Sequence, residues 1–222
     1  MKKFLVSTAV AMTAATGALA SGPTIPVEPY VAPMPPMPVV YDWSGAYAGV
    51  NLLGGRATFT TPGDPGLLPH ANGIGLGGLL GYNLQSGTLV YGGEVHLGYG
   101  NLDGSAPCPN PTFECTSDVG AIGSLRGRVG IAADRTLFYA GLGLTAARVS
   151  HTADDGFIDF EDTNTLRGAS ISVGVDHALQ NGIVLRGEFE HTRFRSQAVN
   201  WDFAYPTSTR MNLLRVGALF RF

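Results

Sequence analysis

Near the middle of the chain the sequence runs Ser124-Leu125-Arg126-Gly127-Arg128-Val129-Gly130-Ile131. Successive side chains of a β-strand point to opposite faces of the sheet. The leucine, valine and isoleucine of this stretch therefore share one face, and the serine and both arginines share the other. We extend the strand to residues 118–132 and place Val119 and Ala121 on the apolar face. The period of two predicts a strand whose two faces meet different environments.

Two further strands carry their charges on one face only. Residues 183–196 set Ile183, Leu185 and Phe189 against Arg186, Glu188 and Glu190. Residues 88–101 set Tyr91, Val95, Leu97 and Tyr99 against Glu94 and His96. Because the charged faces hold both signs, they can neutralise one another inside a barrel whose apolar face is turned to lipid. The predicted barrel-interior charge network is Glu94, Arg126, Arg128, Arg186, Glu188, Glu190 and Arg215.

The alternation recurs in eight segments, which predict an all-β fold: an eight-stranded antiparallel up-and-down transmembrane β-barrel at 41–222. The segments lie near 44–56, 71–84, 88–101, 118–132, 136–150, 165–178, 183–196 and 209–222. Each exceeds the ~9–11 residues that a tilted strand needs to cross a bilayer. Tight turns at 85–87, 133–135 and 180–182 alternate with long loops at 57–70, 102–117, 151–164 and 197–208. This alternation is typical of outer-membrane barrels, and an even strand count places both barrel ends on the periplasmic side and the long loops outside the cell.

The first twenty residues are typical of a signal peptide. Lys2 and Lys3 precede an apolar stretch, and Ala18-Leu19-Ala20 matches the small-x-small cleavage rule. Residues 21–40 follow as a proline-rich leader, which we expect to be an extended periplasmic spacer. Both lysines lie in the signal peptide, so the rest of the chain carries 12 arginines against 17 acidic residues. No basic stretch remains that would indicate nucleic acid as a partner.

Two features of the predicted loops bear on cross-links and metals. Cys108 and Cys115 are expected to form a disulfide, because the chain is predicted to be exported and they make a poor zinc set without a nearby histidine. The loop 151–164 holds the acidic residues Asp154, Asp155, Asp159, Glu161 and Asp162. Their spacing does not fit an EF-hand, so we interpret them as a solvated acidic surface. Bridging to lipopolysaccharide through divalent cations is the alternative. We expect no metal site and no cofactor.

The last strand ends Arg215-Val216-Gly217-Ala218-Leu219-Phe220-Arg221-Phe222. The arrangement of Arg215, Gly217, Phe220 and Phe222 resembles the C-terminal assembly signal of outer-membrane barrels. This resemblance implies the barrel-assembly machinery as a partner.

Three motifs carry a resemblance to a known family. They are Asp42-Trp43-Ser44-Gly45 followed by Tyr47, Gly49 and Asn51; residues 124–130 with Asp134-Arg135; and Leu185-Arg186-Gly187-Glu188-Phe189. In their order and spacing they resemble the small porin-like, immunogenic outer-membrane proteins of alphaproteobacteria. The resemblance spans Tyr41 to Phe222 and implies an eight-stranded, often antigenic barrel at the surface of a Gram-negative cell. The chain departs from the family at His177 and His191, where an aromatic residue is more frequent, and in its cysteine pair.

From these patterns we expect a monomeric, surface-exposed barrel that contacts outer-membrane lipid and lipopolysaccharide and has a structural or interaction role. Buried charges persist when they are paired, so the network is interpreted as a plug in a barrel with little free lumen. A narrow passive porin with a charge-lined path is the alternative. A further alternative is an adhesin or a haem binder that uses His151, His177 or His191. No enzyme is expected, because the adjacent His191 and Thr192 point to opposite faces and no nucleophile motif occurs.

Aromatic residues are expected at two levels of the barrel. Trp43, Tyr82, Tyr91 and Phe138 lie near the periplasmic strand ends, where an interfacial girdle is expected. In the last long loop, Trp201, Phe203 and Tyr205 are expected to be exposed for contact with a partner.

Overall fold

The structure is a computed structural model, and it describes residues 41–222 apart from 64–66, 111, 155, 158 and 201–203. The predicted signal peptide (1–20), the predicted leader (21–40), Asp155, Trp201 and Phe203 lie outside the described residues. No helix in the described part of the chain is long and apolar enough to cross a membrane.

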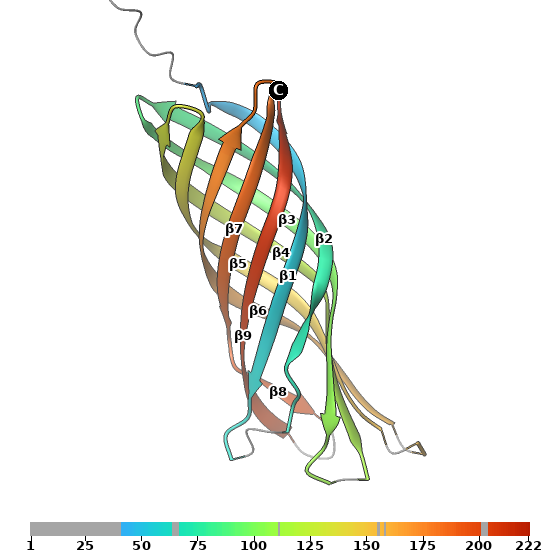
Figure 1. Cartoon of the computed structure of the whole chain (residues 1–222). Helices are drawn as coiled ribbons and strands as arrows, with labels where there is room; N and C mark the ends of the chain where they lie inside the picture. The colour runs from blue at the N-terminus through green and yellow to red at the C-terminus, as the bar shows by residue number, and fades with distance from the viewer. Residues whose placement is uncertain (1–40, 64–66, 111, 155, 158, 201–203) are drawn as a thin grey trace, which may run out of the picture. The chain divides into compact units, whose positions relative to one another are not determined.

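Nine antiparallel strands make up the described structure (Figure 1). They are β1 (Gly45–Thr60), β2 (Ala71–Ser86), β3 (Leu89–Pro107), β4 (Glu114–Ala133), β5 (Thr136–Asp154), β6 (Asp159–Ala178), β7 (Ile183–Phe194), β8 (Gln197–Asn200) and β9 (Ala204–Arg221). Pairing of β1 with β9 closes β1 to β7 and β9 into a ring of eight strands, each next to its neighbour in sequence. The short β8 pairs with the beginning of β9. The predicted eight-stranded up-and-down fold is confirmed.

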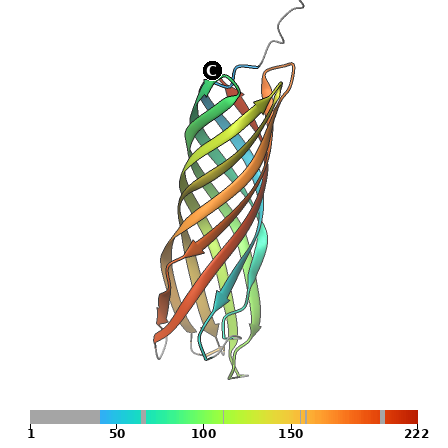
Figure 2. The same ribbon diagram turned by 90° about the vertical axis from the view of Figure 1, so that its left-hand side faces the viewer.

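The register around the ring sets the tilt of the strands. Hydrogen-bonded partners followed once around from Ala48 of β1 lead back to β1 at Thr58, ten positions further along. With ~3.3 Å per residue and ~4.8 Å between strands, this offset corresponds to a tilt of roughly 40°. Figure 2 shows the strands winding obliquely around the wall. At this strand number side chains fill the interior.

The two ends of the barrel differ. The tight turns and the C-terminus lie at one end, which we call the short-turn end, and β8 lies at the other, which we call the long-loop end (Figure 1). Apolar side chains cover the outer wall between them; Leu142 and Leu144 of β5 are 67% and 68% exposed. Toward the long-loop end this apolar belt gives way to outward polar side chains, among them Asn72, Asn101, Arg148, Arg167 and Arg210. The predicted apolar outer face is confirmed.

The predicted faces of strand 118–132 are wrong at one end. The pairings of β4 with β3 and with β5 both shift register between Val119 and Ile122. The shift reverses the alternation, so Val119 is 1% exposed and lies inside, whereas Ala121 lies outside. A β-bulge of this kind interrupts the period-two pattern from which the face was assigned.

Three of the predicted long loops, 102–117, 151–164 and 197–208, are largely strand. β3 and β4 pair as far as Pro107 and Glu114, and β5 and β6 pair as far as Asp154 and Asp159. We call these four strand ends, residues 102–118 and 150–164, the extension. They lack the apolar outer face that marked the strands in the sequence. Within the extension Cys108 and Cys115 form the predicted disulfide, with 5.1 Å between their Cα atoms.

Candidate functional site

Four arginines and four carboxylates meet inside the barrel. They come from β3, β4, β6, β7 and β9, and each is at most 5% exposed. The eight residues are Glu94, Arg126, Arg128, Asp176, Arg186, Glu188, Glu190 and Arg215. Four positive and four negative charges cancel, which is the condition under which buried charges can be retained. We call this set the charge network.

Arg126 lies at the centre of the charge network. Its guanidinium donates to Glu188 at 2.9 Å, to Glu190 at 2.8 Å and to Glu94 at 3.2 Å. Arg215 donates to the same two residues of β7, at 3.1 Å to Glu188 and 2.6 Å to Glu190. The carboxylates of β7 are therefore bonded from two directions across the barrel.

A second group of contacts lies nearer the short-turn end. Arg186 donates to Glu94 at 2.6 Å and to both carboxylate oxygens of Asp176, at 2.7 and 2.8 Å. Arg128 donates to Asp176 at 2.8 Å and also bonds Glu94. Glu94 accepts from three arginines and so joins the two groups into one network.

Two tyrosines complete the hydrogen bonding. Tyr47 donates to Glu94 at 2.6 Å, and Tyr139 donates to Glu188 at 2.8 Å. The guanidinium of Arg128 lies 3.8 Å from the centre of the Tyr139 ring, a cation–π arrangement. Each tyrosine lies over a glycine of the neighbouring strand: Tyr47 over Gly81 and Tyr139 over Gly174. A Cβ at either glycine would come within 2.5 Å of the ring, so only glycine leaves room for these tyrosines.

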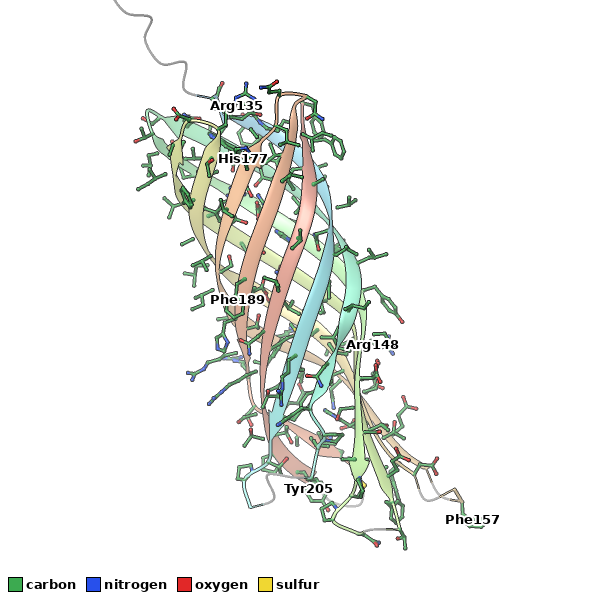
Figure 3. The ribbon with its side chains drawn as sticks, in the orientation of Figure 1. Arg135, Arg148, Phe157, His177, Phe189 and Tyr205 are labelled. Atoms are coloured by element: carbon green, nitrogen blue, oxygen red, sulfur yellow. A yellow bond between two sulfur atoms is a disulfide. The ribbon has the colours of Figure 1, made fainter. Side chains whose placement is uncertain are left out.

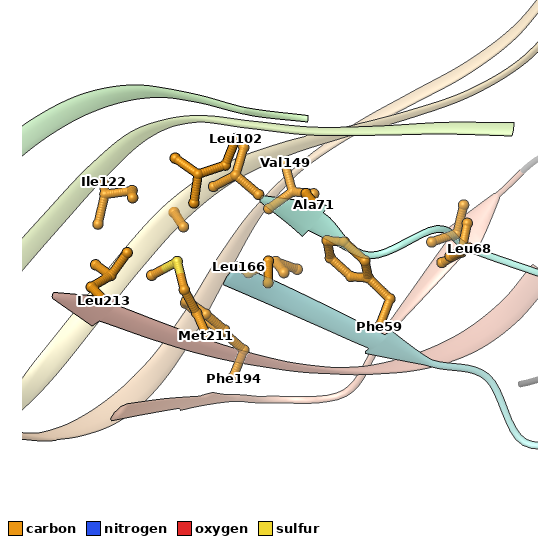
Figure 4. Close-up of a cluster of buried hydrophobic side chains, with 14 of the residues drawn as sticks. Phe59, Leu68, Ala71, Leu102, Ile122, Val149, Leu166, Phe194, Met211 and Leu213 are labelled. Atoms are coloured by element: carbon orange, nitrogen blue, oxygen red, sulfur yellow. The ribbon is translucent and has the colours of Figure 1, made fainter. Parts of the chain in front are cut away.

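Apolar layers lie on both sides of the charge network. Toward the short-turn end, Trp43, Leu79, Val90, Leu137, Val184 and Leu219 pack together. Toward the long-loop end a larger cluster includes Leu53, Phe59, Leu102, Val119, Val149, Met211 and Leu213, and Figure 4 shows side chains from several strands meeting there. The interior is thus apolar, charged and apolar in turn, whereas the sequence predicted only its charged part.

Little empty space remains beside the charge network. A cavity of about 10 Å³ is lined by Asn51, His96, Ser124 and Arg215, among others. Asn51 Oδ1, His96 Nδ1 and Ser124 Oγ are buried without a hydrogen-bond partner in the structure. A cavity of this size has room for about one water molecule, which would satisfy polar atoms that the protein leaves unpaired.

Glu94, His96 and Glu188 form a possible metal-ligand set. Their ligand atoms all lie within 4.8 Å of one another. The guanidinium of Arg126 bonds both glutamates and lies 2.5 Å from His96 Nε2. A cation there would have to displace another cation from its partners, so these residues do not fit a metal ion.

The structure brings together all seven residues of the predicted charge network. The sequence analysis did not predict Asp176, Tyr47 or Tyr139 as part of the network. Asp176 could have been found, because it lies on the same face of β6 as Ser170 and Ser172, and this face points inward. Of the predicted assembly residues, Arg215 belongs to the charge network. Phe220 and Phe222 point outward, and a Cβ at Gly217 would clash with Val50 and Asn51 of β1.

The three histidines considered for haem lie apart. His151 points inward, 2.9 Å from Ser117 Oγ, and its ring packs edge-on against Phe59. His177 lies at the short-turn end (Figure 3) and contacts Thr136 at 3.0 Å. His191 contacts Asn212 at 2.7 Å, and its neighbour Thr192 is buried and donates to Glu190. No pair of these histidines faces a common space.

Two aromatic residues do not lie where the sequence placed them. Trp43 is 1% exposed and packs inside the barrel against Tyr41, because residues that precede β1 turn inward over the short-turn end. Tyr205 is half-buried against the apolar cluster at the long-loop end rather than exposed. Tyr82, Tyr91 and Phe138 are exposed on the outer wall, as predicted.

Three acidic residues of the predicted loop 151–164, Asp154, Glu161 and Asp162, make separate local contacts. Asp154 accepts from the Gly156 backbone at 2.7 Å, Glu161 from Thr163 at 3.1 Å, and Asp162 from Asn164 and from the Asn200 backbone at 2.8 Å. Among the described residues they do not form a cluster of three within metal-binding distance.

A closed ring of eight tilted strands, apolar outside and charge-paired inside, defines an outer-membrane β-barrel protein. The family described as the outer membrane protein beta-barrel domain matches residues 4–222, and the chain belongs to this family.

Two relatives identified by sequence agree with this assignment. A 22 kDa outer membrane protein of Rhizobium leguminosarum bv. viciae is 33% identical over 163 residues, 72% of this chain and 69% of the relative. A 25 kDa outer-membrane immunogenic protein of Brucella abortus biovar 1 (strain 9-941) is 28% identical over 215 residues, 94% of this chain and 90% of the relative. Among solved structures, Neisserial surface protein A has a TM-score of 0.49 at 16% identity, covering 81% of this chain and 98% of that one. The expected resemblance to alphaproteobacterial outer-membrane proteins is confirmed.

Proposed function

We propose that the protein is a closed, monomeric, non-enzymatic barrel of the outer membrane that acts through its surface and does not pass solutes. One observation carries this proposal: a charge-balanced network of eight buried groups lies between two apolar layers. Solute would have to cross all three layers.

Each layer opposes permeation for a different reason. An apolar constriction excludes water and with it hydrated ions. In the charge network every carboxylate is already bonded to at least two arginines, and separating a buried pair costs about 3–5 kcal/mol. The charge network is therefore proposed to be a plug rather than a path.

The long-loop end is proposed to face the cell exterior and to hold an interaction surface on the extension. There the disulfide packs with Phe113 and Ala153. A concave region of about 720 Å³ is lined by Pro107, Phe113, Glu114 and Asp154, among others. Phe157, at the tip of the β5–β6 hairpin, is 98% exposed (Figure 3). Apolar and acidic groups side by side are suited to a protein partner.

The C-terminal strand is proposed to carry the signal for the barrel-assembly machinery. Phe220 and Phe222 are 50% and 79% exposed and lie on the outer wall. Arg215 lies inside, so only the aromatic part of the motif remains accessible once the barrel has closed. This supports recognition before closure.

A narrow passive porin is the second candidate, because eight charged groups on the inner wall would line a path if water entered. Liposome swelling separates the two. Vesicles that hold the refolded protein are diluted into isotonic arabinose, with a folded general porin as the positive control. The closed barrel predicts the swelling rate of empty vesicles; a rate proportional to the amount of folded protein would favour the porin.

A further inference from the structure

Five arginines on or next to β5, β6, β7 and β9 point outward where the apolar belt ends toward the long-loop end. Each is exposed, and at least one of the residues next to it in the chain is buried inside the barrel. They are Arg148 of β5, Arg167 of β6, Arg193 of β7, Arg195 directly after β7, and Arg210 of β9. Figure 3 shows Arg148 on the wall between the two ends. We call these residues the arginine cluster.

The arginine cluster places like charges against one another. Arg193 and Arg210 are direct partners across β7 and β9. The Arg195 backbone amide donates to the Arg167 carbonyl at 2.9 Å, so these two residues also lie side by side. Like charges directly opposite each other destabilise a sheet. No hydrogen bond or ion pair joins any of the five guanidinium groups to another described residue, and the arrangement therefore favours an anion from outside the protein.

The cluster occupies one side of the barrel. β5, β6, β7 and β9 follow one another in the ring. β1, which pairs with β9, adds the exposed Arg56 at the same edge of the belt. There β2 and β3 present Asn72, Asn101 and Asp103, and β4 presents Asp118. A basic surface confined to five adjacent strands indicates a localised ligand rather than a general affinity for a membrane surface.

A groove on the wall links the arginines to the apolar belt. It has a volume of about 770 Å³ and its lining includes Arg167, Arg193 and Arg195. The same groove includes Leu97, Leu125 and Leu144, each more than 60% exposed. A ligand that fills it is anionic at one end and apolar at the other, with the apolar end toward the bilayer.

We propose that the arginine cluster binds the phosphate groups of lipopolysaccharide, with the acyl chains against the leucines of the groove. Guanidinium groups bond phosphate oxygens in pairs, and the cluster lies at the level where the hydrocarbon region ends. A small free anion has no apolar part that could contact the leucines of the groove. The guanidinium groups contact the phosphates directly, without a bridging cation. This proposal rests on the proposed orientation of the long-loop end toward the exterior.

Binding of lipid A by the refolded full chain tests the site. Vesicles containing bisphosphorylated lipid A, dephosphorylated lipid A or phosphatidylglycerol are titrated against the detergent-solubilised protein, with inorganic phosphate as a competitor. The double variant Arg193→Gln with Arg210→Gln removes the pair of directly opposed arginines. Arg135→Gln removes an exposed arginine at the short-turn end (Figure 3) and is the matched control.

Bisphosphorylated lipid A is expected to bind wild type and R135Q alike, and the double variant about ten-fold or more weakly. Dephosphorylated lipid A is expected to bind the wild-type protein about ten-fold or more weakly than bisphosphorylated lipid A does. Equal binding by all three proteins, equal binding of phosphatidylglycerol, or full competition by inorganic phosphate would overturn the proposal. Because the cluster lies outside the barrel, the double variant leaves vesicle permeability unchanged, so this result is independent of the closed-barrel proposal.

Discussion

Arg126 is bonded to three carboxylates from two strands, and its removal leaves more than one of them short of a partner. Truncating one member of a buried ionic group costs about 3–5 kcal/mol. We therefore expect Arg126→Met, which keeps most of the side-chain volume, to lower the free energy of unfolding by this amount. The urea concentration at which half of the protein has left the folded gel band measures this change in stability. Arg135→Met, at an exposed position, is expected to change stability by less than about 0.5 kcal/mol; equal effects of the two would contradict a structural role for the charge network.

His151 gives the extension a pH dependence. It lies three positions beyond Arg148, past the apolar belt, and burial lowers its pKa to about 4. Between the ordinary pKa of about 6.5 and about 4, the unfolded chain takes up a proton that the folded chain does not. The stability associated with neutral His151 is complete above about pH 6.5 and declines by about 3 kcal/mol as the pH falls to about 4.

His151→Gln is expected to flatten this part of the stability profile, and His177→Gln, at an exposed position, is expected to leave it unchanged. Urea midpoints at pH 4.5 and 7.5 for the three proteins measure the difference. Parallel profiles for wild type and H151Q would show that His151 becomes protonated in the folded state at its ordinary pKa.

The sequence reveals which face a charged residue occupies but not its partners. The alternation around Arg126 and Glu188 predicted that both point inward. Their contact joins residues 62 positions apart and depends on the register of three intervening strand pairings. Asp176 was missed because it lies close to a tight turn, and Trp43 was misplaced because it precedes the first strand and has no alternation to follow.

At the scale of strands, glycine positions determine where the interior tyrosines fit. A Cβ at Gly174 of β6 would lie 2.5 Å from Cζ of Tyr139, whereas a Cβ at Gly54 of β1 would meet nothing within 4 Å. Gly174→Ala is expected to displace the Tyr139 ring from Glu188 and Arg128 and to lower the free energy of unfolding by about 1–3 kcal/mol. Gly54→Ala is expected to be nearly neutral. Urea unfolding of both variants tests the pair, and a small effect of G174A would show that the ring adapts.

The strands themselves were largely predictable, and their ends were not. All eight long strands and the three tight turns were found, because a period of two persists wherever one face meets lipid. Beyond the membrane that constraint disappears, and the extension pairs through serine, threonine and small residues that look like loop in the sequence. The register shift at Val119 could not be predicted from the sequence, because a single extra residue leaves the alternation regular on both sides of it.

At the scale of the whole molecule, the barrel separates its two surfaces by chemistry. Apolar side chains outside match the bilayer, and the interior holds charge only where it can be cancelled. The two apolar layers inside are a feature that the sequence did not predict, because inward leucines and valines near the strand ends resemble the core of any sheet. Together with the charge network they fill the barrel, as our proposal of a closed barrel that acts through its surface requires.

Single-channel recording in a planar bilayer tests the closed interior most directly. The refolded protein is first shown to be folded by its gel mobility before and after boiling. The structure predicts a quiet bilayer for wild type, and discrete current steps only when all three layers are breached, for example by Arg126→Ala combined with Phe59→Ala and Leu137→Ala. Regular steps from the wild-type protein whose size changes with Glu188→Gln would show that the charged interior is a hydrated path, and would contradict the plug.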